Sequence, residues 1–160
     1  MPIQNTDNHN YLNPSRFVFI IDQPGLEHVE FSCQLVSIPG ISVDSIPTQF
    51  RGMRANMTGS SIVFEPFTAR FIIDETLENY STIFNWLYKE MGSDQPEQTL
   101  HKDLILLIYT NNNNVKTKIH MISTIPTSLS PVEFETTKTD TQYLYADVSF
   151  NLDYYQIRQA

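Results

Sequence analysis

Apolar and polar residues alternate along much of this chain, which is the pattern of β-strands that bury one face in a sheet. The clearest case runs from Tyr143 to Tyr155. Every even position from 144 to 154 is apolar, and polar residues fill most of the positions between them. The alternation predicts one long strand here, with a second, polar face that is formed by Asp147, Ser149, Asn151 and Asp153.

Shorter alternating or apolar runs predict the remaining strands. Cys33 falls on the apolar side of its run, as does Leu35. Pro126 and Pro131 indicate a connection between strands. Roughly seven or eight strands with no alternation of strands and helices predict an antiparallel β-sandwich or barrel. The runs are Arg16–Ile21, Glu27–Val36, Ile62–Glu65, Thr68–Ile73, Asp103–Tyr109, Val115–Ile122 and Val132–Phe134.

One stretch carries a convincing helical pattern. Thr76 is placed to cap the helix and Gly92 to end it. We expect this helix to plug the open side of the sandwich, with a partner-binding helix as the alternative. The apolar residues that recur at steps of three and four are Leu77, Tyr80, Phe84, Leu87 and Met91, with Ile83 widening the stripe and Trp86 flanking it.

Two parts of the chain show neither pattern: an N-terminal arm and a projecting segment. Residues 1–15 are polar and predict a flexible N-terminal arm, while residues 16–160 predict a single β domain. About twenty residues around 44–60 show little core signal, which is uncommon in a compact domain unless the segment is functional. An ordinary surface loop is the other interpretation. The residues that we expect to make contacts there are Asp44, Gln49, Arg51, Met53, Arg54 and Met57.

Composition limits the classes of function. Ten Lys and Arg against eighteen Asp and Glu give a net charge of −8, so tight binding of DNA is not expected. A wall that repels DNA is compatible with this charge, and mild acidity that serves solubility is the other interpretation. Cys33 is the only cysteine, which excludes an intrachain disulfide. A secretory signal and a membrane span are not expected, because the sequence has no cleavable-signal pattern and no long apolar run.

The sequence carries no recognisable catalytic constellation. It contains no Gly-x-Ser-x-Gly, no phosphate-binding glycine-rich loop and no His-Glu-x-x-His, and its four histidines stand far apart. Asp147 and Asp153 lie six residues apart on one predicted strand, roughly 20 Å, which is too far for the carboxylate pair of a glycosidase. We therefore expect no catalytic residue, no metal and no cofactor, and a protein that is not an enzyme.

The order of several sequence blocks resembles the tail tube proteins of contractile-tailed, T4-like bacteriophages. The first block is an opening strand that contains Phe17–Ile20. The last is the terminal strand, Val148–Tyr155. The blocks between them are Phe31–Cys33, Val36–Ile41, Ile46–Pro47 with Phe50 and Arg54, Phe67–Glu75 and Phe84–Leu87. Together they cover roughly residues 16–157.

This resemblance implies a hexameric ring in which inner strands of all copies join into one β-barrel. Such rings stack into a hollow tube within a contractile sheath, and the genome passes down the lumen. The implied partners are further copies of the chain, the sheath, and baseplate and terminator proteins, with DNA only transiently in the lumen and no membrane anchor. The implied location is the virion tail, assembled in the host bacterial cytoplasm.

From these inferences we expect the polar face of the last strand to look into the lumen and the segment at 44–60 to contact the next ring. A solvated sandwich face is the alternative for the first expectation. Other roles on the same fold remain open: a baseplate tube initiator, a tube terminator or a type VI secretion-like ring. Outside this class, the alternative is a monomeric β-sandwich binding module.

Overall fold

The computed structural model describes residues 11–21, 33–50, 52–92, 101–137 and 143–159. Neighbouring strands pair antiparallel in every sheet. The predicted class, mainly β with antiparallel sheets and one helix, is confirmed. The elements are, in order, β1 (Phe17–Ile21), β2 (Cys33–Val36), β3 (Ile41–Phe50), β4 (Met53–Phe64), β5 (Phe67–Ile72), α2 (Glu78–Gly92), β6 (Lys102–Tyr109), β7 (Val115–Leu129), β8 (Tyr145–Asn151) and β9 (Tyr154–Gln159).

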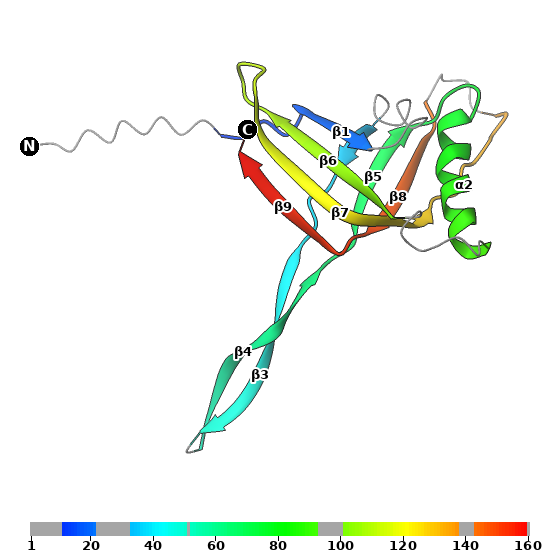
Figure 1. Ribbon diagram of the computed structural model, residues 1–160. Helices are drawn as coiled ribbons and strands as arrows, with labels where there is room; N and C mark the ends of the chain where they lie inside the picture. Colours follow the sequence, from blue (N-terminus) through cyan, green and yellow to red (C-terminus); the bar gives the residue numbers. More distant parts are fainter. Residues whose placement is uncertain (1–10, 22–32, 51, 93–100, 138–142, 160) are drawn as a thin grey trace, which may run out of the picture.

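Two packed layers of strands share the long strand β7 (Figure 1). One layer has the order β1-β6-β7-β9, and the other has the order β2-β5-β8-β7. The first part of β7 pairs with β9, and its last part pairs with β8. Between these parts lies Ser123, with a positive φ of 58°, opposite a register shift in β6. Such a bulge bends a strand, so β7 passes from one layer into the other.

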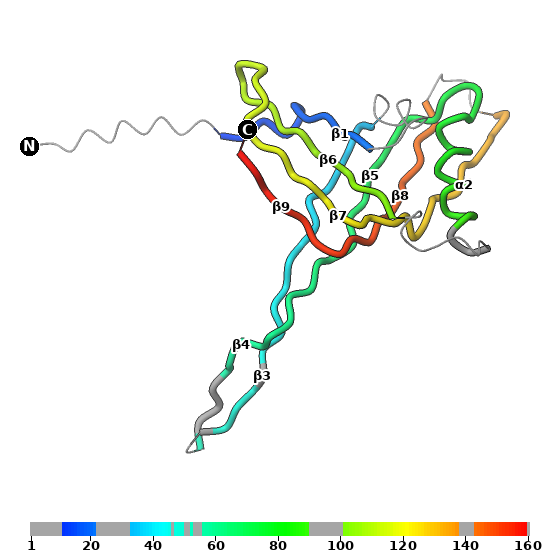
Figure 2. Tube along the Cα trace, viewed as in Figure 1, coloured from blue at the N-terminus to red at the C-terminus, as the bar shows by residue number. Residues whose placement is uncertain are grey.

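The predicted long strand at residues 143–155 is interrupted. Figure 2 shows the chain turning between β8 and β9, where Leu152 and Asp153 leave the strand. Both strands nevertheless follow one edge of β7, and the register is unchanged across the break: Ile125 opposes Asn151, and Ile122 opposes Tyr154. One continuous strand was therefore a wrong prediction, because the partner of a bent strand must bend with it.

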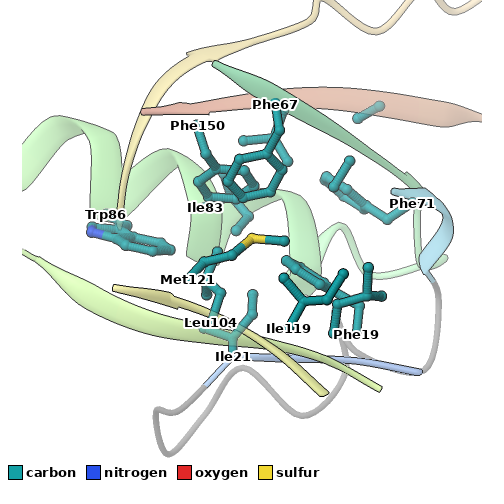
Figure 3. Close-up of a cluster of buried hydrophobic side chains, with 14 residues drawn as sticks. Phe19, Ile21, Phe67, Phe71, Ile83, Trp86, Leu104, Ile119, Met121 and Phe150 are labelled. Carbon is teal, nitrogen blue, oxygen red and sulfur yellow. The ribbon is translucent and has the colours of Figure 1, made fainter. Parts of the chain in front are cut away.

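The core lies between the two layers (Figure 3). Aromatic rings from the second layer pack in this core: those of Phe67 and Phe150 are stacked, with their centroids 5.1 Å apart. The helix α2 lies beside the open side of the layers and adds Trp86, whose ring centroid is 5.9 Å from that of Phe150. Burying these side chains is the main source of stability for such a sandwich. The buried apolar residues of the strands are Phe19, Ile21, Phe67, Ala69, Phe71, Leu104, Leu106, Ile119, Met121, Ala146, Val148 and Phe150.

The buried face of α2 differs from the predicted stripe. Ile83 and Trp86 are buried with 0% and 4% exposure, and the polar Asn79 is buried beside them. Phe84 is 52% exposed and Leu77, which precedes the helix, is 38% exposed. The prediction was wrong for Phe84 and Leu77, because the buried row includes a polar residue, which apolar periodicity cannot reveal; Ile83 and Trp86, predicted beside the stripe, are in the core. Tyr80 and Leu87 are half-buried, and the side chain of Met91 lies outside the described residues.

Hydrogen bonds explain how this helix begins. The carbonyl of Leu77 accepts from the amide of Ser81 at 2.9 Å, so the first helical bond starts at Leu77 and not at the predicted cap, Thr76. The side-chain amide of Asn79 donates to the carbonyl of Ile72 at 2.7 Å, and its oxygen accepts from the amide of Asp74 at 3.2 Å. Asn79 therefore fixes the turn between β5 and α2.

Three further strand predictions need correction. Residues 33–36 of the second predicted strand form β2, whereas residues 27–32 lie outside the described part. Leu35 is exposed because the register shifts between Cys33 and Leu35. Pro126 lies within β7, opposite Phe150, at a second register shift. Residues 132–134 form no strand.

Candidate assembly surfaces

A two-stranded ribbon, formed by β3 and β4, extends away from the sandwich (Figure 1). It contains the segment at 44–60, which was predicted as a projecting loop and is formed by two paired strands. The periodicity is weak because the register shifts between Val43 and Ser45, which displaces the alternation of side chains along the ribbon. Gly59 lies at this shift, and a Cβ on it would approach the backbone oxygen of Asp44 to 2.5 Å.

The base of the ribbon exposes apolar side chains. Val43 opposes Ile62, and these two side chains and that of Ile41 are about half exposed. The base contacts the sandwich where the ring of Phe64 meets that of Tyr155 edge to face, with centroids 5.3 Å apart. Two-stranded ribbons are marginally stable in water. Uncovered apolar pairs on such a ribbon are typical of a surface that packs against another chain.

The predicted stacking residues are spread along this ribbon. Asp44, Gln49 and Met57 lie exposed on it. Arg51 lies outside the described residues, as do the side chains of Met53 and Arg54.

The outer face of β8 carries an ion pair that the sequence pattern did not reveal. Asp147 lies directly opposite Arg70 of β5. Nε and Nη2 of Arg70 donate to the two carboxylate oxygens of Asp147 at 2.7 Å and 3.0 Å. The side-chain hydrogen bond from Arg70 lowers the pKa of Asp147. The pattern of a single strand does not identify the residue opposite on the neighbouring strand. The neutralisation of Asp147 by Arg70 therefore follows only from the pairing of β5 with β8.

The other predicted lumen residues divide between the strand and the break. Ser149 is half-buried opposite Thr68, and Asn151 is exposed at the end of β8. Asp153 is exposed in the break between β8 and β9, where its amide donates to the carbonyl of Ile122 at 3.2 Å. Asp147, Ser149 and Asn151 therefore alternate along one strand, whereas Asp153 belongs to the junction.

A histidine cluster lies at the bend of β7. Nδ1 of His101 is 2.5 Å from Oγ of Ser123, and the amide of Ser123 donates to Oδ1 of Asp103 at 3.1 Å. Nε2 of His120 is 3.5 Å from Oδ2 of Asp103. Asp103 therefore holds the bulge at Ser123 and does not orient His101, so the cluster lacks the relay of a Ser-His-Asp triad.

Other chemistry is equally limited in the described part of the chain. No group of three His, Cys, Asp or Glu residues there is arranged to hold a metal ion. Burial raises the pKa of Cys33 to about 11, which keeps it a thiol near neutral pH. No helix in the described segments is long and apolar enough to cross a membrane.

Comparison with known proteins shows what this chain is similar to. No protein-family model matches the sequence. The tail tube terminator protein of Enterobacteria phage T4 is 25% identical over 159 residues, which cover 94% of this chain and 90% of that protein. The chain is related to the tube proteins of contractile tails.

Solved structures show the same fold. The tube-terminating cap of the anti-feeding prophage matches this tube-related protein with a TM-score of 0.74 and 18% identity over 100% of both chains. The sheath/tube terminator of the extracellular contractile injection system PVC, in its extended state, gives 0.71 and 19%, over 94% and 99% of the two chains. These relatives are structural parts and not enzymes, so the expectation of a non-enzymatic protein is confirmed.

Proposed function

We propose that this chain is a tube terminator, the ring that ends the tube of a contractile tail. The observation that carries the proposal is the nearly full-length sequence similarity to the T4 tail tube terminator. The match in fold to a tube-terminating cap over the whole of both chains agrees with it. A terminator was one alternative at the sequence level, and it now takes precedence over the repeating tube subunit.

Open strand edges support assembly into a ring. In the described part of the chain, β1, β2 and β9 each pair on one side only. Exposed strand edges promote aggregation unless they are covered or joined. We propose that copies join these edges around a six-fold axis, which closes the sheets into a shared barrel.

The lumen wall is the second part of the proposal. We place Asp147, Ser149, Asn151 and Asp153 at the lumen. Because Arg70 neutralises Asp147, this wall is polar with few net charges, which suits transient passage of DNA without the strong attraction that lysine and arginine rows exert.

Cysteine labelling tests this placement. In assembled rings, Asn151→Cys is expected to react with a small maleimide but not with a polyethylene glycol maleimide too large for the lumen. Asn85→Cys, on the exposed side of α2, is the control and should react with both reagents. Equal reaction of Asn151→Cys with both reagents contradicts a luminal position.

We further propose that the ribbon binds the last ring of the tube. Its exposed apolar base and the residues Asp44, Gln49, Arg51, Met53, Arg54 and Met57 supply the contact. Deleting residues 51–57 is expected to abolish attachment to tubes in a sedimentation assay while single rings still form. Ser60→Ala, on the same ribbon, is the control, and normal attachment of the deletion variant would refute this role.

Electron microscopy of negatively stained protein tests the function as a whole. The purified chain is expected to form isolated rings, and mixing with the tube protein of the same tail should give tubes that end in such a ring. Rings that stack on their own would identify the second candidate, a main tube subunit, which the projecting ribbon also suits. Rings that start tube growth instead of ending it would indicate a baseplate initiator, and persistent monomers contradict a tube role.

The remaining partners follow from this position. We propose contacts with the tail sheath and, through the tube, with the baseplate, a location in the virion tail, and assembly in the host bacterial cytoplasm. A tube ring of a type VI secretion-like system would instead assemble without a virion.

A further inference from the structure

One end of the sandwich is basic in an otherwise acidic protein. Residues 11–21, 104–122 and 154–159 contain four Lys or Arg and no Asp or Glu, although the whole chain carries a net charge of −8. We call Arg16, Lys116, Lys118 and Arg158 the basic end. The last three are exposed.

The register makes this clustering unfavourable for the isolated chain. Lys118 of β7 lies directly opposite Arg158 of β9. Like charges directly opposite each other on neighbouring strands are destabilising. Arg158 donates to Oε1 of Gln156 at 2.6 Å, and Arg16 donates to the carbonyl of Asn111 at 3.0 Å. These partners, all within the described residues, are uncharged and so do not compensate the charge of the basic end.

A matching acidic surface lies on the other side of the molecule. Residues 73–79 and 130–137 contain five Asp or Glu and no Lys or Arg. We call Asp74, Glu75, Glu78, Glu133 and Glu135 the acidic end. Its two segments are joined, because the hydroxyl of Tyr80 in the first turns of α2 donates to the carbonyl of Ser130 at 3.2 Å. Glu78 also favours the helix N-terminus.

The two ends face away from each other. In Figure 1, β9 and the start of β7 lie at the left of the sandwich, while α2 and the segment that joins β7 to β8 lie at the right. The acidic end is held in shape by Asn79, whose side chain bonds both Ile72 and Asp74. A molecule with opposite charges on opposite sides is suited to head-to-tail contacts, which form closed rings when the rotation between copies closes.

We infer that the basic end of one copy binds the acidic end of the next copy around the ring. This inference rests on the proposed ring and specifies which surfaces meet in it. Charge complementarity sets the register between copies and suppresses wrong contacts such as basic end to basic end.

Two complementary variants test the inference. Variant A carries Lys116→Glu, Lys118→Glu and Arg158→Glu, so both of its ends are acidic. Variant B carries Glu75→Lys, Glu133→Lys and Glu135→Lys, which makes its acidic end basic. Each variant alone is expected to weaken ring formation about tenfold or more in analytical ultracentrifugation, since like charges then meet. An equimolar mixture should restore rings in which A and B alternate.

Matched controls separate charge at these ends from charge in general. Lys89→Glu and Glu65→Lys change exposed charges outside both ends and are expected to leave rings intact. If A and B form rings as well as the unmodified chain, or if their mixture fails to restore rings, the inference is wrong while the proposed ring stands. If the unmodified chain forms no rings, the proposed function itself fails.

A different partner for the basic end gives a different result. If variant A forms normal rings but loses binding to a DNA duplex that the unmodified protein retains, the basic end contacts nucleic acid, which overturns the inference.

Discussion

At the scale of single residues, the clearest finding is the partner of Asp147. The alternation of its strand placed this carboxylate correctly away from the core, but the lumen wall was then expected to be acidic. Two hydrogen bonds from Arg70, on a strand 77 positions away in sequence, make the pair neutral. Cross-strand partners depend on register, and one strand's pattern contains no information about register.

The pKa of Asp147 predicts how this pair depends on pH. The folded-state pKa lies below its ordinary value of 3.8, so the pair stabilises the fold above that value and loses its effect as pH falls through the lowered pKa. Asp147→Asn should therefore lower the free energy of unfolding at pH 7, and the difference should shrink in acid. Urea denaturation at a series of pH values measures this.

The control for that series is Asp153→Asn, which removes an exposed carboxylate in the strand break. It is expected to change stability little at any pH. A constant difference between Asp147→Asn and the unmodified protein from pH 7 into acid would contradict the assigned cause.

At the scale of elements, α2 shows why an apolar stripe locates a helix better than it orients one. The steps of three and four in sequence identified the helix, whose described part runs to Gly92. Its rotation was not predicted correctly, because the buried row runs through Asn79, Ile83 and Trp86. The hydrogen bonds of Asn79 to the end of β5 decide that rotation.

Truncating neighbouring residues of α2 tests its orientation. Ile83→Ala should lower the free energy of unfolding by about 2–5 kcal/mol, because it leaves a cavity in the core. Phe84→Ala, one position along on the exposed side, should cost less than about 1 kcal/mol. Equal losses in urea denaturation would contradict the orientation of the helix.

The ribbon offers a second test at this scale. Gly59→Ala places a methyl group against the backbone of Asp44, so strands β3 and β4 must separate or shift there. We expect amide hydrogen exchange along the ribbon to become faster, with little change in the sandwich. Ser60→Ala, at an exposed neighbouring position, should leave exchange unchanged, and slow exchange in both variants would show that the close approach is tolerated.

At the scale of the whole molecule, the sequence predicted the architecture but not the register shifts within its sheets. Alternation is local, so most strands and the antiparallel class followed from it. These register shifts lie at Val43, Ser123 and Pro126, and each depends on which strand lies opposite. The ribbon, the bend of β7 and the split between β8 and β9 were missed for that reason.

Salt provides a whole-molecule test of the proposed contact between ends. Raising ionic strength from about 0.1 M to about 1 M shortens the screening length from about 10 Å to about 3 Å. Rings held by opposite charges should therefore dissociate at high salt, which sedimentation velocity measures. Rings that grow more stable with salt would indicate that apolar contacts dominate instead.

The shared edge of β7 also has a consequence for the order of events during synthesis. β8 fills the space between β5 and β7, and β9 continues along β7, yet both strands leave the ribosome after nearly all the rest of this sequence. Until they emerge, the second layer lacks an inner strand, and the nascent chain has no complete sandwich to close. A complete sandwich therefore forms only in chains whose translation has passed β9.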